Sequence, residues 1–84
     1  MKFIRTENGD YIAAEKIEKL YIDYDSKWSR QCVYADIGSD YYTLFSAECD
    51  NALDVSQNVY TLAHDICQKW LDGFVAGLNR KDGQ

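Results

Sequence analysis

The sequence has no long apolar run and no paired cysteines, and these two absences exclude several classes of protein. No stretch of its 84 residues approaches the roughly 20 consecutive apolar residues of a membrane-spanning helix. The first residues, KFIRTENGD, lack the apolar middle of a signal peptide. The three cysteines form no CxxC pair, which is typical of reduced thiols rather than of a disulfide framework. We therefore expect a cytoplasmic protein without a membrane segment.

The sequence also lacks the short motifs of common enzymes and cofactor-binding proteins. It contains no GxGxxG, Walker or GxSxG motif, so nucleotide binding and the common hydrolase chemistries have no support. The acidic segments DIGSD and ECDNALD do not match a calcium loop, which needs alternating oxygen ligands, a central glycine and a closing glutamate. We expect a protein that is not an enzyme and has no cofactor, and no motif assigns it to a family.

The only histidine, His64, lies three positions before Cys67, so the two side chains share one face of a helix. Zinc would need two further ligands, for which Cys32 and Cys49 are the other soft candidates. A Cys–His catalytic pair is the other chemical interpretation, but neighbours on one helix rarely point toward each other. We favour a structural role for both residues and expect no metal site and no catalytic residue.

The charge is acidic and evenly spread. The formal net charge of −5 comes from 14 acidic against 9 basic residues, with no run of either sign. A field of that sign repels phosphate groups, which counts against direct nucleic-acid binding and favours basic partners. Hydrophobic residues make up 46% of the chain, which is typical of a globular protein. We expect one small domain over residues 1–84, with residues 79–84 as a flexible tail.

One long amphipathic helix is predicted from Asp54 to Leu78. Its apolar residues follow one another at spacings of three or four, which places their side chains on a single face. Either Asp54 or Ser56 is the expected N-cap, because a side-chain oxygen there can accept a free backbone N–H. The stripe consists of Val59, Leu62, Ile66, Trp70, Phe74 and Leu78. Such a stripe needs a partner surface, and the strands before it are the surface within this chain.

The first strands form a predicted hairpin. The segments Phe3–Thr6 and Asp10–Ala13 flank Asn8-Gly9, a dipeptide that favours the positive φ angles of a type I′ turn. We expect this hairpin to lie at the edge of a sheet. Ala14–Ile17 offers too few helix-forming residues to nucleate a helix, so a single turn is expected there.

Three further strands follow, over Glu18–Tyr24, Gln31–Ile37 and Asp40–Ser46. The last two are joined by Gly38-Ser39, where glycine suits the first central position of a type II′ turn. The predicted fold class is therefore α+β: an antiparallel β-meander, led by a hairpin, with one C-terminal helix packed on one face.

A two-residue turn also predicts the register of the last two strands. It pairs Val33 with Leu44 on the face toward the helix, and Cys32 with Phe45 on the opposite face. The face toward the helix is expected to carry Leu20, Ile22, Val33, Ala35, Tyr42 and Leu44. The opposite face is expected to carry Tyr21, Cys32, Tyr34, Tyr41 and Phe45.

That opposite face is unusually aromatic for a surface that contacts only water. One interpretation is that tyrosines are good strand formers whose hydroxyls face solvent. The other is a partner-binding or dimer face, because aromatic side chains with a polar tip are enriched at interfaces. The helix has surplus apolar residues beyond its stripe, which favours a homodimer or a protein partner. They are Tyr60, Cys67, Leu71 and Val75.

The acids Asp36, Asp40 and Asp50 cluster around the last hairpin and the segment before the helix. They are interpreted either as solvated turn residues or as an acidic patch for a basic partner. The leading hypothesis is a small, non-enzymatic interaction protein that binds a protein partner or itself. The alternative is an acidic inhibitor from a phage or mobile element, which blocks a nucleic-acid-binding protein by mimicking phosphate charge.

Overall fold

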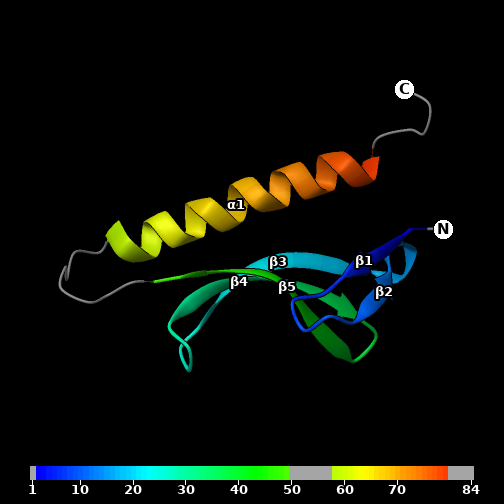
Figure 1. Cartoon of the computed structure of the whole chain (residues 1–84), viewed down its shortest axis with the longest axis horizontal. Coiled ribbons are helices and arrows are strands. Elements are labelled where there is room, and N and C mark those ends of the chain that lie inside the picture. Colours follow the sequence, from blue (N-terminus) through cyan, green and yellow to red (C-terminus); the bar gives the residue numbers. More distant parts are fainter. Residues whose placement is uncertain (1, 50–57, 80–84) are drawn as a thin grey trace.

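A computed structural model describes residues 2–49 and 58–79 and has the predicted α+β class. It combines a two-stranded hairpin, a three-stranded antiparallel sheet in the order β3-β4-β5, and one helix that packs on the sheet (Figure 1). In chain order the elements are β1 (Phe3–Arg5), β2 (Tyr11–Ala13), the 3-10 turn η1 (Ala14–Lys16), β3 (Lys19–Asp25), β4 (Arg30–Ile37), β5 (Asp40–Glu48) and α1 (Asn58–Asn79). No helix in the described ranges is both long and apolar enough to cross a membrane.

The first hairpin is confirmed, but its turn is not the predicted type I′. That turn requires positive φ at both Asn8 and Gly9, whereas only Gly9 has it, at +95°. The amide of Gly9 donates to the carbonyl of Thr6 over 3.0 Å, and the amide of Thr6 donates to the carbonyl of Asp10 over 2.7 Å. The Thr6 hydroxyl also accepts the amide of Asp10 at 3.1 Å. These bonds close a three-residue loop in which Gly9 has a positive φ. The Thr6 side chain stabilises this loop, which takes the place of the predicted two-residue turn.

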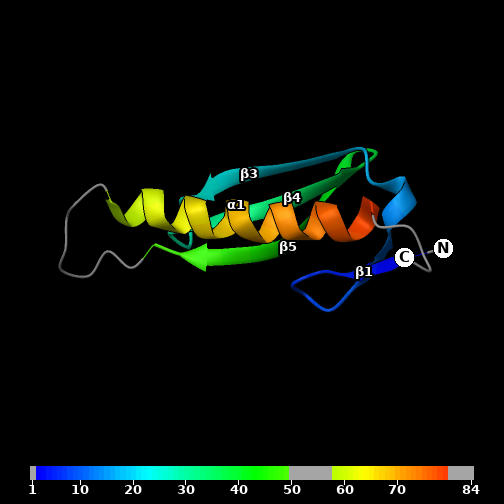
Figure 2. The same cartoon turned by 90° about the horizontal axis from the view of Figure 1, so that it is seen from above.

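The hairpin attaches to the outer edge of the sheet, as expected. The amide of Glu7 donates to the carbonyl of Thr43 on β5 over 2.8 Å. Figure 2 shows β1 beside β5, on the side away from β3. Ile12 of β2 is buried in the same core cluster as Leu44. The hairpin therefore covers part of the edge strand and extends the core.

The turn between β4 and β5 follows the prediction. Gly38 has a φ of +63° and Ser39 does not have a positive φ, which is the pattern of a type II′ turn. Ile37 pairs with Asp40 directly beside the turn.

The predicted register holds from the turn as far as Tyr34 and then fails. A bulge lies between Val33 and Tyr34, so Val33 pairs with Phe45 instead of Leu44. Beyond the bulge, Cys32 pairs with Ser46 and not with Phe45. An extra residue in one strand changes which face its following side chains occupy. The bulge therefore moves Phe45 to the helix side of the sheet.

The helix is rotated relative to the predicted stripe in its N-terminal half. Leu62 is 62% exposed and Ile66 is 43% exposed, whereas Ala63 and Cys67 are buried. The Cys67 thiol donates to the carbonyl of Gln31 over 3.3 Å. Small residues at these two positions let the helix backbone lie close to β4, because a larger side chain would hold the helix away from the strand.

The C-terminal half of the stripe is confirmed at Trp70 and Phe74. The ring of Phe45 stacks on Trp70 with centroids 5.1 Å apart, and Trp70 stacks on Phe74 at 4.9 Å. This stack joins α1 to β5 and borders the buried core. The buried core consists of Ile12, Val33, Ala35, Leu44, Ala47, Cys49, Ala63 and Cys67.

Some predictions fall on parts of the chain that lie outside the described residues. These include the expected N-cap at Asp54 or Ser56 and the tail beyond Asn79. The side chain of Val59 is also outside the described part, although its backbone belongs to α1.

Candidate functional site

Three tyrosines meet on the side of the sheet that faces away from α1. Tyr21 on β3 pairs directly with Tyr34 on β4, and their ring centroids lie 5.5 Å apart at an interplanar angle of 36°. Tyr41 on β5 approaches Tyr34 diagonally, with centroids 5.5 Å apart and ring planes at 82°. We call these three residues the tyrosine face. The sequence predicted all three for this side, and the structure places them in one continuous cluster.

The chemistry of the tyrosine face is set by its acidic neighbours. The hydroxyl of Tyr21 donates to Oδ1 of Asp36 over 3.0 Å. Burial, followed by this hydrogen bond, raises the pKa of Tyr21 above its ordinary value. Burial also raises the pKa of Tyr34, with a hydrogen bond to Cys32 as the next cause. Both phenols therefore stay protonated at neutral pH, and they present neutral rings and hydroxyl dipoles.

A pocket of about 190 Å³ opens among the tyrosines and is lined by Tyr21, Asp23, Tyr34 and Tyr41. Asp23 follows Tyr21 by two positions on β3, so both side chains lie on the same face of the strand. Its Oδ1 accepts the amide of Tyr24 over 2.8 Å, which holds the carboxylate beside the pocket. Sequence reasoning did not select Asp23, although its alternation with Tyr21 already places it on this face.

Two residues predicted for the interaction surface have other roles. Phe45 contacts Trp70 on the helix side, so its predicted placement on the open face is wrong; the bulge is the physical reason. Cys32 is on the open side of β4 but is fully buried, so it presents no contact surface. Burial raises the pKa of its thiol. Of the five predicted residues, the three tyrosines remain as candidate contacts.

The predicted acidic patch is not seen as one cluster. Asp36 is half-buried and accepts the Tyr21 hydroxyl, whereas Asp40 is exposed at the start of β5. Asp50 lies outside the described residues. The acid that the structure adds to the tyrosine face is Asp23.

The structure separates His64 from Cys67. The imidazole of His64 is half-exposed, and its Nδ1 lies 4.0 Å from Oδ1 of Asp65. Cys67 is fully buried and points to the carbonyl of Gln31. Within residues 2–49 and 58–79, no group of three or more His, Cys, Asp or Glu side chains is arranged to hold a metal ion.

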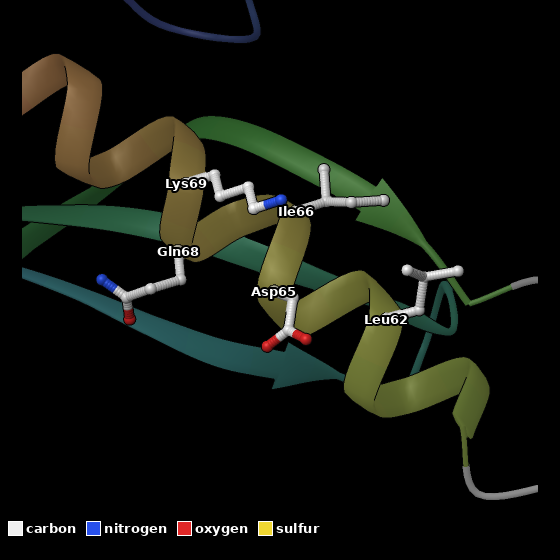
Figure 3. A pocket seen from close by; sticks show the side chains of 5 residues that line it. All are labelled: Leu62, Asp65, Ile66, Gln68 and Lys69. Atoms are coloured by element: carbon white, nitrogen blue, oxygen red, sulfur yellow. The ribbon is translucent and has the colours of Figure 1, made fainter.

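A second candidate surface lies on the outer side of α1. A groove of about 300 Å³ runs along the helix there. In Figure 3, Leu62 and Ile66 project toward the β5 side of the helix, and Asp65 and Gln68 project toward the β3 side. The groove is lined by Leu62, Asp65, Ile66, Gln68 and Lys69.

From the sequence, other residues were predicted to form the surplus apolar surface of the helix. Cys67 is fully buried, Leu71 and Val75 are half-buried, and the side chain of Tyr60 lies outside the described part. The rotation of the helix explains the difference, because it exposes Leu62 and Ile66 in their place.

Comparisons with protein-family models, with curated proteins and with solved structures found no match for this chain.

Proposed function

We propose that this protein is a small, non-enzymatic interaction module that binds a protein partner through its tyrosine face. The observation that carries the proposal is the contiguity of Tyr21, Tyr34 and Tyr41 on the side of the sheet opposite α1. Tyr41 is 67% exposed, so the cluster offers a large aromatic area to a partner. Tyrosine is enriched at the centres of protein interfaces, because its rigid ring buries much area at a small entropic cost.

The arrangement of the three rings supports this function more than an isolated exposed tyrosine would. Tyr21 is held by its bond to Asp36, and Tyr34 is packed between the other two rings. A partner would therefore bind to side chains that are already ordered, so these side chains would lose little conformational entropy on binding. We assign no catalytic, cofactor-binding or metal-binding role to any residue in this proposal.

The test compares two tyrosines that are equally exposed in different places. Tyr41 on the tyrosine face and Tyr11 on β2 are both 67% exposed. Immobilised wild-type protein, Tyr41→Leu and Tyr11→Leu are incubated with a cell lysate, and captured proteins are quantified by mass spectrometry. We expect Tyr41→Leu to lose at least one specifically captured protein, and Tyr11→Leu to retain it. Equal capture by all three proteins would contradict the proposal.

Self-association is a second candidate, and the outer groove of α1 favours it. Leu62 and Ile66 form an exposed apolar patch one helical turn apart, with Asp65 and Lys69 beside it. Two copies of this helix packed antiparallel about a two-fold axis would bring each acidic residue toward the other copy's basic residue. Each copy would also cover the other's apolar patch.

Sedimentation equilibrium tests the self-association directly. We expect a dimer whose dissociation constant rises at least tenfold in Leu62→Ser, since that change removes the centre of the apolar patch. Tyr11→Leu is again the control and should leave the equilibrium unchanged. A monomeric wild-type protein at high concentration would exclude this candidate and leave the tyrosine face untouched.

The hypothesis of a nucleic-acid mimic rests on the net charge alone and stays a prediction from the sequence. Its distinguishing property is a steep loss of partner binding with salt, because charge pairing between exposed groups is screened. Binding to the tyrosine face should fall less steeply with salt, because buried aromatic area contributes to it beside any charge pairing.

A further inference from the structure

We propose that the pocket between the three tyrosines receives a lysine ammonium group presented by a protein partner. This inference rests on the proposed function, since it names the chemistry that a partner would bring to the tyrosine face. It is carried by the pocket's lining, which consists of three aromatic rings and one carboxylate: Tyr21, Tyr34, Tyr41 and Asp23.

The lining favours a cation over a neutral or anionic group. The face of an aromatic ring carries negative charge, so a cation within about 6 Å of the ring centroid is attracted to it. Asp23 adds a carboxylate to the same pocket. A second carboxylate, that of Asp36, accepts the hydrogen bond of the Tyr21 hydroxyl. The protein as a whole carries a net charge of −5, which draws a basic partner toward this surface.

The geometry favours a compact ammonium over a flat guanidinium. The planes of Tyr34 and Tyr41 are nearly perpendicular, so they form two walls of a corner. An ammonium group with its adjoining methylenes is compact in all directions and can contact both walls, whereas a guanidinium stacks on one plane at a time. The volume of about 190 Å³ is well above the roughly 10–15 Å³ that one water molecule needs, so the pocket has room for an ammonium group.

The protein already shows this contact at one of the rings. Nζ of Lys19 lies 4.9 Å from the ring centroid of Tyr21. Lys19 precedes Tyr21 by two positions on β3, and Asp23 follows it by two, so the internal lysine and the pocket acid lie on either side of this tyrosine. The Tyr21 ring therefore attracts an ammonium group from within the chain, and Tyr34, Tyr41 and Asp23 are the lining residues that would hold a partner's lysine.

The test is a titration of the full chain followed by NMR of the aromatic side chains at constant ionic strength. Four probes are compared. Nα-acetyl-lysine methylamide represents the lysine of a partner, and Nα-acetyl-arginine methylamide represents the guanidinium. Choline represents a free quaternary ammonium, and 3,3-dimethylbutan-1-ol is the neutral isostere of choline.

We expect saturable shifts of the Tyr21, Tyr34 and Tyr41 signals with the lysine derivative and with choline, and none with the neutral alcohol. Tyr41→Leu and Asp23→Asn should each weaken binding of the lysine derivative at least fivefold. Tyr41→Phe keeps the ring and should keep binding, and Tyr11→Leu should bind like wild type. Melting temperatures of the variants show whether a loss reflects unfolding, and Tyr41 is exposed enough for its replacement to leave the core intact.

Four results would overturn the inference. Three of them are equal shifts with the neutral alcohol, tighter binding of the arginine derivative than of the lysine derivative, and no saturable shift with the lysine derivative. Choline binding more than about tenfold tighter than the lysine derivative would also overturn it, in favour of a free small molecule. If the lysine derivative fails while Tyr41→Leu still loses captured proteins, the proposed function stands without this inference. If capture is also unchanged, both are wrong.

Discussion

The three cysteines act as small buried side chains. Cys32 and Cys67 have no exposed surface, and Cys49 has almost none. Burial raises the pKa of each thiol above its ordinary value. Since the thiolate is the reactive form, these thiols should be unreactive in the folded protein at neutral pH.

The raised pKa values predict how stability depends on pH. In the unfolded chain the thiols lose their protons near pH 8.5, whereas in the folded chain they keep them to higher pH. Their contribution is therefore complete below about pH 8.5 and is lost as the pH rises toward the folded pKa values. The raised pKa of Tyr34 adds the same trend above about pH 10.

Urea denaturation at pH 7.0 and at pH 10.0 measures this effect. We expect a lower free energy of unfolding at the higher pH, with no loss from these groups between pH 6 and pH 8. Stability that does not change up to pH 10 would contradict the burial of the thiols.

At the level of single residues, alternation along the strands was enough to find the tyrosine face. Tyr34 and Tyr41 lie on the predicted side because the register between the Gly38 turn and Tyr34 is as predicted. Tyr21 lies there because it pairs directly with Tyr34. Phe45 was misplaced because a bulge intervenes, and a bulge depends on tertiary packing around Leu44 rather than on a local sequence signal.

At the level of elements, the periodicity predicted a helix where α1 lies and an end within one residue of Asn79, but it did not predict the rotation of the helix. Hydrophobicity alone selects Leu62 and Ile66, whereas the packed face uses Ala63 and Cys67. Small and medium-sized side chains of the sheet belong to the same buried core, among them Val33, Ala35 and Ala47. Small helix residues let the helix and the sheet pack closely, whereas large ones at the same positions would hold them apart.

Two substitutions in α1 test its rotation. Leu62→Ala should change the free energy of unfolding by no more than about 0.5 kcal/mol, because the side chain is exposed. Trp70→Ala should cost about 2 kcal/mol or more, because it removes the ring between Phe45 and Phe74. Chemical denaturation of both variants gives the comparison. A cost of about 2 kcal/mol or more for Leu62→Ala would contradict the observed rotation, because it would mean that Leu62 is buried as the predicted stripe requires.

A polar cluster fastens the first hairpin to the sheet. Nη1 of Arg30 donates to Oε1 of Glu7 over 2.8 Å, and the Ser46 hydroxyl donates to Oε2 of Glu7 over 2.7 Å. Nε of Arg30 also lies 3.5 Å from Oδ2 of Asp25. Because Glu7 lies in the hairpin loop, these bonds connect it to both β4 and β5.

Replacing Glu7 by glutamine should weaken this attachment modestly. Both charged side chains are partly exposed, so solvent screens the pair and the expected loss is about 1 kcal/mol, smaller at high salt. Urea denaturation at low and high salt measures it, and the exposed Glu15→Gln is the matched control. An unchanged stability at low salt would show that the charge of Glu7 adds nothing to the attachment, which would then rest on the backbone bond to Thr43 and on apolar contacts.

At the level of the whole molecule, the fold class was predictable because the strands are joined by short, local connections. Each strand pairs with its neighbour in sequence, and two glycine turns mark the hairpins at Gly9 and Gly38. The layer order follows once α1 covers one side of the three-stranded sheet. The bulge and the rotation of α1 could not be predicted from the sequence, because both depend on how the helix packs on the sheet.

Two surfaces of the described residues are candidates for binding, and they lie on different elements. The tyrosine face lies on the free side of the sheet, and the Leu62–Ile66 patch lies on the outer side of α1. We propose partner binding for the first surface and self-association for the second. The two roles are separable, because a single substitution can change one surface without touching the other.

The most direct measurement is the amount of captured partner retained by Tyr41→Leu relative to Leu62→Ser, with each normalised to wild-type protein. We expect Tyr41→Leu to lose most of the captured partner and Leu62→Ser to retain it. Retention by Tyr41→Leu together with loss by Leu62→Ser would contradict the central claim, because binding would then lie on the helix and not on the tyrosine face.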